Sequence, residues 1–190
     1  MPEAEPPRLP LLSLEEARAA AEAAGVPDYM AALNIFRVLL RHPKLARAVH
    51  DLLAALLWNG QLDVRLRELV IMRIGWVTGS EYEWAQHWRV ALGLGLSEDD
   101  LLGVRDWRAH RSFGAAERAV LAATDEALAT GRVGAGAWTA CVEAVGDDAA
   151  VLLELVGAIA TWTMVSGLLR TLEVPLEDDL ASWPPDGRKP

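Results

Sequence analysis

Residues 68–92, ELVIMRIGWVTGSEYEWAQHWRVAL, decide the fold and carry the candidate chemistry. The stretch predicts two helices that are separated at Gly79. At 100° per residue, Ser80, Glu83 and His87 fall within about 60° of one another on the second helix. One helix face therefore presents a hydroxyl, a carboxylate and an imidazole.

Helix-forming residues dominate the rest of the chain. Ala, Leu, Glu and Arg are abundant, and the alternation typical of strands is hard to find. The 190 residues suffice for one domain with a core of ordinary size. The sequence therefore predicts an all-α, single-domain helical bundle of about eight to nine helices. We expect an extended proline-rich segment at 1–12, the helical domain at 13–175 and an irregular tail at 176–190.

Capping residues and helix breakers indicate where individual helices begin and end. Ser13-Leu-Glu-Glu16 predicts a capping box, and a second helix is expected to run from the turn at 26–28 to about Arg41. Asp63 and Ser97 are expected to cap later helices. The interior stretch 108–114 has the weakest pattern, so we predict a mobile loop there.

The composition narrows the classes of function. A formal net charge of −9, without a cluster of Lys and Arg, argues against nucleic-acid binding, because phosphate contacts need clustered positive charge. The single cysteine, Cys141, lies in an apolar helical pattern and is expected to be a buried thiol. The first ten residues lack the basic and apolar regions of a signal peptide. These features favour a cytoplasmic protein.

Residues 151–169, VLLELVGAIATWTMVSGLL, are long enough to span a membrane. They include Glu154, and a central carboxylate is unfavourable in lipid. We therefore expect a mostly buried central helix and no membrane partner.

His87 is the preferred general acid or base, because an imidazole titrates near neutrality and can move a proton either way. Glu83 lies four residues earlier, within side-chain reach of the ring. Two structural alternatives stay open. His87 can be a half-buried residue satisfied by a backbone carbonyl or by Glu83. Ser80 and Glu83 can instead form a capping box at the helix start.

Glu68 is the third candidate for catalysis. It lies near the start of an otherwise apolar helix, and if it faces the pocket, desolvation would raise its pKa and make it a proton donor. The alternative is a surface ion pair with Arg65, three residues earlier. Met72, Trp76 and Trp84 are expected to line the pocket, with plain core packing as the alternative. The two glutamates and the histidine lack the usual spacing of metal ligands, so neither a metal nor another cofactor is expected.

Residues 65–101, RLRELVIMRIGWVTGSEYEWAQHWRVALGLGLSEDDL, resemble the carboxymuconolactone decarboxylase-like superfamily, which includes the alkylhydroperoxidase D-type proteins. In the peroxidase branch a glutamate precedes a C-x-x-C pair and a histidine. Glu68 and His87 match the first and last of these, whereas Ser80 and Glu83 stand at the cysteine positions. Peroxide reduction in that branch needs an attacking and a resolving thiol, so a thiol peroxidase is not expected.

The decarboxylase branch carries E-W-x-x-H, which residues 83–87, EWAQH, match. This resemblance implies an all-helical fold, trimers or hexamers, and cofactor-free decarboxylation of a small lactone carboxylate. The apolar share of 52% agrees with a homo-oligomer that buries surface between subunits.

We therefore expect a cofactor-independent acid–base enzyme, a decarboxylase-like lyase that acts on a small lactone or carboxylate. His87 would transfer the proton, Glu83 would orient it, and Glu68 would act as a second acid or relay. The alternative is a non-catalytic member of the same family, an oligomeric small-molecule binder or structural protein. In that case Ser80 and Glu83 serve only as the helix cap. The sequence identifies neither the substrate nor the number of subunits.

Overall fold

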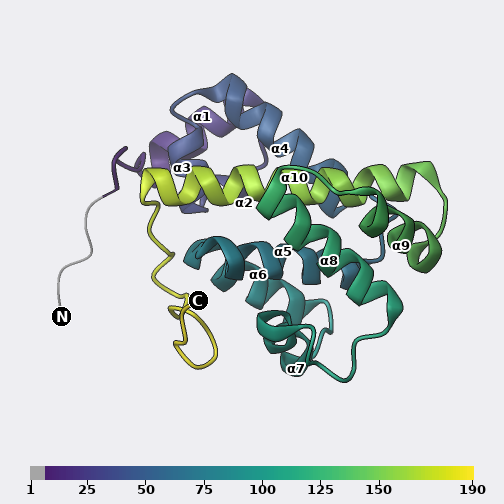
Figure 1. Cartoon of the computed structure of the whole chain (residues 1–190). Coiled ribbons are helices and arrows are strands. Elements are labelled where there is room, and N and C mark those ends of the chain that lie inside the picture. Colours follow the sequence, from purple (N-terminus) through teal and green to yellow (C-terminus); the bar gives the residue numbers. More distant parts are fainter. Residues whose placement is uncertain (1–6) are drawn as a thin grey trace. The chain divides into compact units, whose positions relative to one another are not determined.

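The computed structural model describes residues 7–190, and in that part of the chain it shows ten α-helices, one 3-10 helix and no strand (Figure 1). This confirms the predicted all-α class. The elements are α1 (Leu14–Ala24), α2 (Asp28–Ala31), α3 (Asn34–Leu39), α4 (Pro43–Leu57), α5 (Val64–Thr78), α6 (Glu81–Gly93), α7 (Glu98–Gly103), η1 (Val104–Asp106), α8 (Ala115–Thr130), α9 (Ala135–Val145) and α10 (Ala149–Leu172).

The helix count exceeds the expected one partly because the single helix predicted to reach about Arg41 is two short ones, α2 and α3. Residues 7–12 are without helix or strand, and the rest of the segment predicted to be extended lies outside the described residues.

The chain forms two compact units. One holds the residues up to Asn59 together with Leu168–Leu180, and the other holds Gly60–Gly167 together with Ala181–Pro190. Helix α10 begins in the second unit and ends in the first. The predicted division at residues 12 and 175 stays a prediction.

In the first unit, α1 begins with the predicted capping box. The Ser13 amide donates to the Glu16 carboxylate at 2.8 Å, and the Glu16 amide donates to the Ser13 hydroxyl at 3.2 Å. At the start of α3, the Asn34 amide donates to the Glu177 carboxylate at 2.7 Å. The Asn34 side chain also donates to two backbone carbonyls just before Glu177. These bonds fix the segment that follows α10 within this unit.

In the second unit, α5 is a central helix that packs against both α6 and α8. The Asp63 side chain caps it, as predicted, by accepting from the Leu66 amide at 3.0 Å. Near its end, Gly75 allows α6 to approach closely, because a Cβ at this position would lie 3.2 Å from the Trp84 amide nitrogen. Gly79 then ends α5 in the left-handed conformation, with φ of 68°.

We expect Gly79→Ala to lower the free energy of unfolding by about 1 kcal/mol, because an L side chain is disfavoured at this positive φ. Space is not the cause, since the nearest atom to an added Cβ is a Pro190 side-chain carbon 3.8 Å away. Urea denaturation would measure the loss. Gly93→Ala is the control, because Gly93 is helical and its added Cβ would meet nothing within 4 Å. An equal loss in both variants would contradict the explanation.

Helix α10 is the one helix of residues 7–190 that is long and apolar enough to cross a membrane, and a core helix can pass the same test. In this structure 44% of its most apolar window is buried. Glu154, near its start, accepts the backbone N–H groups of Gln61 and Leu62 at 2.7 Å each. The carboxylate thus anchors the turn that precedes α5.

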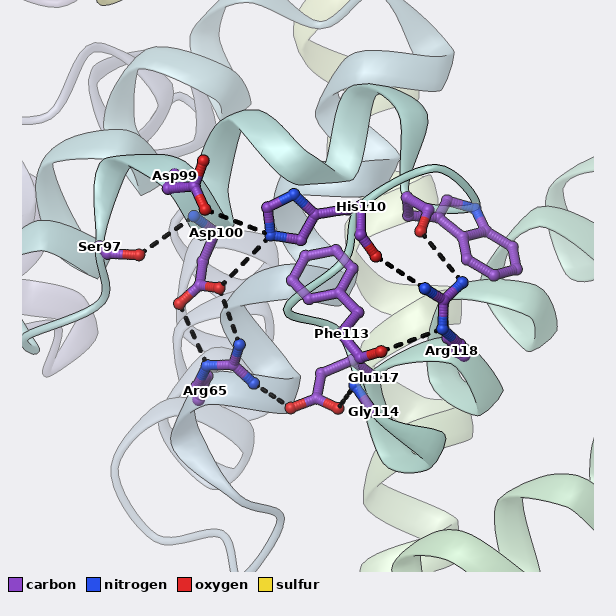
Figure 2. A network of polar contacts seen from close by, with 10 residues as sticks. Arg65, Ser97, Asp99, Asp100, His110, Phe113, Gly114, Glu117 and Arg118 are labelled. Atoms are coloured by element: carbon purple, nitrogen blue, oxygen red, sulfur yellow. Dashed lines mark hydrogen bonds and ion pairs between the residues drawn. The ribbon is translucent and has the colours of Figure 1, made fainter.

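The segment 108–114, predicted to be a mobile loop, is fastened to α8 by Arg118 (Figure 2). The Arg118 guanidinium donates to the His110 carbonyl at 2.7 Å and to the Arg108 carbonyl at 3.1 Å. Its Nε donates to the Phe113 carbonyl at 3.0 Å. One half-buried arginine therefore bonds three backbone carbonyls of this segment and holds it against the start of α8.

Candidate functional site

The sequence-predicted groups Glu68, Glu83 and His87 come together where α5 meets α6. His87 Nδ1 lies 2.7 Å from Glu68 Oε2, and His87 Nε2 lies 3.6 Å from Glu83 Oε2. A fourth member, Trp162 of α10, donates its indole N–H to His87 Nε2 at 3.0 Å. Glu68 is completely buried, and Glu83 and His87 are only 5% and 8% exposed. We call these four residues the acid–base cluster.

Arg67, rather than Arg65, is the cationic partner of Glu68. Its Nε and Nη2 both donate to Glu68 Oε1, at 3.0 and 2.9 Å. Arg65 instead pairs with Asp100 and Glu117, on α7 and α8 (Figure 2). The proposed surface pair of Arg65 with Glu68 is therefore wrong, and the buried carboxylate has one oxygen for Arg67 and one for the imidazole.

The hydrogen bonds define the tautomer of His87. A carboxylate only accepts, so Glu68 requires the proton on Nδ1. An indole N–H only donates, so Trp162 requires a lone pair on Nε2. The neutral ring with its proton on Nδ1 satisfies both partners. Protonation of Nε2 would exchange the bond from Trp162 for an ion pair with Glu83.

The pKa values of the two buried glutamates are shifted in opposite directions. Burial raises the pKa of Glu83 to about 7, with the nearby charge of Glu68 acting in the same direction and His87 opposing it. Burial also raises the pKa of Glu68, but His87 and Arg67 outweigh it and the net shift is downward. The expectation that Glu68 would be the acid of raised pKa is thus wrong. Glu83 takes that property, whereas Glu68 stays ionised and holds the ring.

The pKa of His87 responds to the same surroundings. Burial lowers it, whereas Glu68 first and then Glu83 raise it, and the net shift is upward. His87 Nε2 and the Glu83 carboxyl are therefore two neighbouring titratable groups whose pKa values are both raised, that of Glu83 to about 7.

Residues 43–126 match the model of the carboxymuconolactone decarboxylase family. This segment belongs to the carboxymuconolactone decarboxylase family. It includes Glu68, Ser80, Glu83 and His87, whereas Trp162 and the C-terminal tail lie beyond it. The resemblance drawn from the sequence is confirmed. No curated protein matches the chain.

Solved structures share the fold. A peroxidase-related protein with an alkylhydroperoxidase AhpD core, from Ralstonia eutropha JMP134, has a TM-score of 0.73 and 17% identity, covering 92% of this chain and 94% of that one. A peroxidase-related protein from Silicibacter sp. TM1040 has a TM-score of 0.72 and 12% identity, covering 94% and 96%. The debrominase Bmp8 has a TM-score of 0.66 and 17% identity, covering 87% and 86%. At these identities the likeness concerns the fold alone.

Ser80 does not cap α6 of the carboxymuconolactone decarboxylase-family segment through its side chain. Its amide donates to the Gly75 carbonyl at 2.9 Å, and its hydroxyl makes no cap bond. The capping-box alternative for Ser80 and Glu83 is therefore wrong. The Ser80 hydroxyl is buried without a hydrogen-bond partner, as is that of Ser166, four residues after Trp162 on α10. Both hydroxyls lie on helix faces that also carry members of the acid–base cluster.

The predicted pocket-lining residues are all buried. Trp76 and Trp84, however, contact other aromatic rings than the one that contacts His87. Met72 is fully buried on α5. The rings of Trp76 and Trp84 lie 5.3 Å apart, and both contact Trp183 of the C-terminal tail. The aromatic neighbour of His87 is instead Trp162, with ring centroids 5.6 Å apart. Trp162 was not predicted from the sequence. The one feature that could have indicated it is that it is the single tryptophan in residues 151–169.

Neither a group of side chains suited to bind a metal ion nor a reactive thiol is found in the described part of the chain. Among residues 7–190, no group of three or more His, Cys, Asp and Glu side chains is arranged to hold a metal ion. Cys141 is buried on α9, and burial raises the pKa of its thiol, which disfavours the reactive thiolate.

Proposed function

We propose that this chain is a cofactor-independent acid–base enzyme, a decarboxylase-like lyase that acts on a small lactone or carboxylate. One observation carries the proposal: a buried imidazole has an ionised carboxylate on Nδ1 and a carboxyl group of pKa about 7 beside Nε2. Catalytic acids and bases need a pKa near the working pH, and burial beside a charge is the usual means of shifting it. The family of the segment agrees with this chemistry.

In the proposed reaction, the C–C bond to the substrate carboxylate breaks and CO2 leaves. The electron pair passes into the conjugated lactone carbonyl, and the carbon that held the carboxylate then takes a proton. Glu83 in its protonated form supplies this proton. His87 Nε2 lies beside the Glu83 carboxyl and accepts a proton that it passes on to reset that carboxyl, and Glu68 holds the ring through Nδ1. The unpartnered Ser80 hydroxyl is a donor suited to a substrate oxygen.

Two observations bear on the substrate. Ser80 and Glu83 stand where the peroxidase branch has its cysteine pair, which supports a reaction other than thiol-based peroxide reduction. The debrominase Bmp8 binds a small ring compound, 2,3,4-tribromopyrrole, on the same fold. This supports a small ring as the ligand here.

The test is CO2 release from a panel of small lactone carboxylates. We expect His87→Ala and Glu83→Gln each to lower kcat/KM by about 10² or more, because each removes a group that transfers the proton. His50→Ala is the matched control, since His50 lies in the other unit, beside Asp51. Full activity of both cluster variants would overturn the assignment.

The alternative is a non-catalytic member of the family that binds a small molecule or serves a structural role. The burial of the acid–base cluster favours it, because a satisfied core network also shows little exposure. A wild-type chain that binds panel compounds without turnover, and whose His87→Ala variant changes affinity only modestly, would establish this alternative.

The proposal includes a homo-oligomer, a trimer or hexamer. Large apolar side chains are exposed at positions such as Leu153, Trp58 and Tyr29, with 72% of Leu153 accessible in the single chain. Light scattering of the purified protein would give the number of subunits. A cytoplasmic location also stays a prediction.

A further inference from the structure

The C-terminal tail inserts an indole among the aromatic side chains of α5 and α6. Trp183 is only 3% exposed, and its ring centroid lies 6.0 Å from that of Trp76 and 6.1 Å from that of Trp84. The Trp84 indole N–H donates to the Pro184 carbonyl at 2.7 Å. The predicted irregular tail is thus without helix or strand, but its tryptophan is buried as deeply as a core residue.

A buried arginine holds a carboxylate of the same tail. Arg105 Nη1 and Nη2 donate to the two oxygens of Asp186 at 2.7 and 2.9 Å, in the two-pronged geometry typical of carboxylate recognition. The guanidinium also lies 4.7 Å from the Trp76 ring centroid and 4.9 Å from that of Trp84. The side chain of Arg105 is 8% exposed. We call Trp76, Trp84 and Arg105 the tail site.

Three observations indicate that the tail occupies this site reversibly and is not a required part of the hydrophobic core. Trp183 has φ of 46°, a left-handed conformation that is unfavourable for a residue other than glycine. Arg105 Nε is buried and has no hydrogen-bond partner, although the tail is in place. The tail itself has no helix or strand, and its backbone is bonded to α6 at the Pro184 carbonyl.

Beside Asp186 the structure has a hollow of about 440 Å³. Its wall includes Asp99 and His110, which Figure 2 shows side by side. Arg105 and Arg188 line it together with Asp99, Asp106 and Asp186, so the hollow has a mixed charge and the cation nearest the Asp186 carboxylate is Arg105. A ligand larger than the tail side chains therefore has room to extend from the tail site.

We propose that the tail site binds a small aromatic carboxylate, and that Trp183 and Asp186 are its resident intramolecular occupants. The aromatic ring of the ligand would take the place of the Trp183 indole, against the rings of Trp76 and Trp84. Its carboxylate would take the place of Asp186 on Arg105. This site differs from the acid–base cluster in its residues, so the inference does not depend on the proposed lyase activity.

The tail competes at a high effective concentration, on the order of millimolar for a short linker, so the wild-type site is mostly occupied in cis. An external ligand then binds with an affinity reduced by the small fraction of open sites. Removing the two tail side chains, while keeping the full chain, should expose the affinity of the site itself. A buried cavity left by a large side chain can bind a small aromatic molecule of matching shape.

The experiment is calorimetric titration of the full-length chain with indole-3-acetate. We expect the double variant Trp183→Ala/Asp186→Asn to bind the probe at least tenfold more tightly than wild type, and Asp186→Asn alone to fall between them. Adding Arg105→Gln to the double variant should remove the gain, as should replacing the probe by indole, which lacks the carboxylate. The matched control is Trp138→Ala/Asp178→Asn, which changes an exposed tryptophan and an exposed aspartate and should bind like wild type.

Circular dichroism of each variant would show whether its helix content is preserved, so that a change in affinity can be separated from unfolding. Equal affinity in wild type, Asp186→Asn and the double variant, with helix content preserved, would overturn the proposal. Loss of the helical signal in the double variant would also overturn it, because Trp183 would then be an integral part of the core. A gain in affinity that survives Arg105→Gln would show an apolar cavity without carboxylate recognition.

Discussion

Glu68→Ala should lower the free energy of unfolding by about 3–5 kcal/mol, the usual loss when one partner of a buried ion pair is removed. Glu68 is completely buried and accepts hydrogen bonds from both Arg67 and His87. Its removal takes away both N–H bonds from Arg67 to Oε1 and the acceptor of His87 Nδ1–H. Chemical denaturation at pH 7 would measure the effect.

The control is Glu98→Ala, because Glu98 is exposed in the first turn of α7 and should change stability by less than about 0.5 kcal/mol. The Glu68→Ala/His87→Ala double variant completes a cycle that isolates the interaction between the two side chains. We expect the two losses to be clearly non-additive. A loss below about 1 kcal/mol for Glu68→Ala would contradict the picture of a buried, ionised carboxylate.

Glu83→Gln should make the protein relatively more stable as the pH rises. The pKa of Glu83 is about 7 in the folded chain, against an ordinary value of 4.5 for a glutamate. Between these two values the folded state holds a proton that the unfolded state has released, so the stability of the wild type falls with increasing pH. The full penalty is present above pH 7 and amounts to about 3 kcal/mol at 1.36 kcal/mol per pKa unit. Glutamine mimics the protonated acid and avoids this penalty.

Urea denaturation of wild type and Glu83→Gln at several pH values between about 4 and 8 would test this directly. The free energy of unfolding of Glu83→Gln minus that of the wild type should increase between pH 4.5, the ordinary pKa of a glutamate, and about pH 7, the pKa of Glu83 in the folded chain. Above that pH the difference should stay constant. Glu81→Gln provides the matched control. Glu81 is the other glutamate in the first turn of α6, and its carboxylate accepts a hydrogen bond from the Ser182 hydroxyl. A difference between wild type and Glu83→Gln that stays constant with pH would show that Glu83 titrates normally.

Local rules predicted the elements that build the site. The Gly79 break, the Asp63 cap and the shared helix face of Glu83 and His87 all follow from spacing within a few residues. The family resemblance matched Glu68 and His87 to a glutamate and a histidine of the peroxidase branch, but it did not predict the direct contact between them that the structure shows.

Partners that arrive from distant positions were beyond such rules. Trp162 reaches His87 across 75 residues, and nothing in the local pattern distinguishes it from a core tryptophan. The reversal of roles between Glu68 and Glu83 depends on the tertiary fold as well, because it is decided by which buried carboxylate lies closest to His87 and Arg67. Trp183 was assigned to an irregular tail, since burial against Trp76 and Trp84 requires the tertiary fold.

The crowding of indoles around Trp84 gives this protein an intrinsic optical label. Half of its eight tryptophans, residues 76, 84, 88 and 183, form a chain of ring contacts no longer than 6.1 Å. Rings held this close and at fixed angles couple their excited states, and near-ultraviolet dichroism reports such fixed aromatic packing. Departure of the last ring would therefore be visible in the unmodified chain, without a dye or an engineered chromophore.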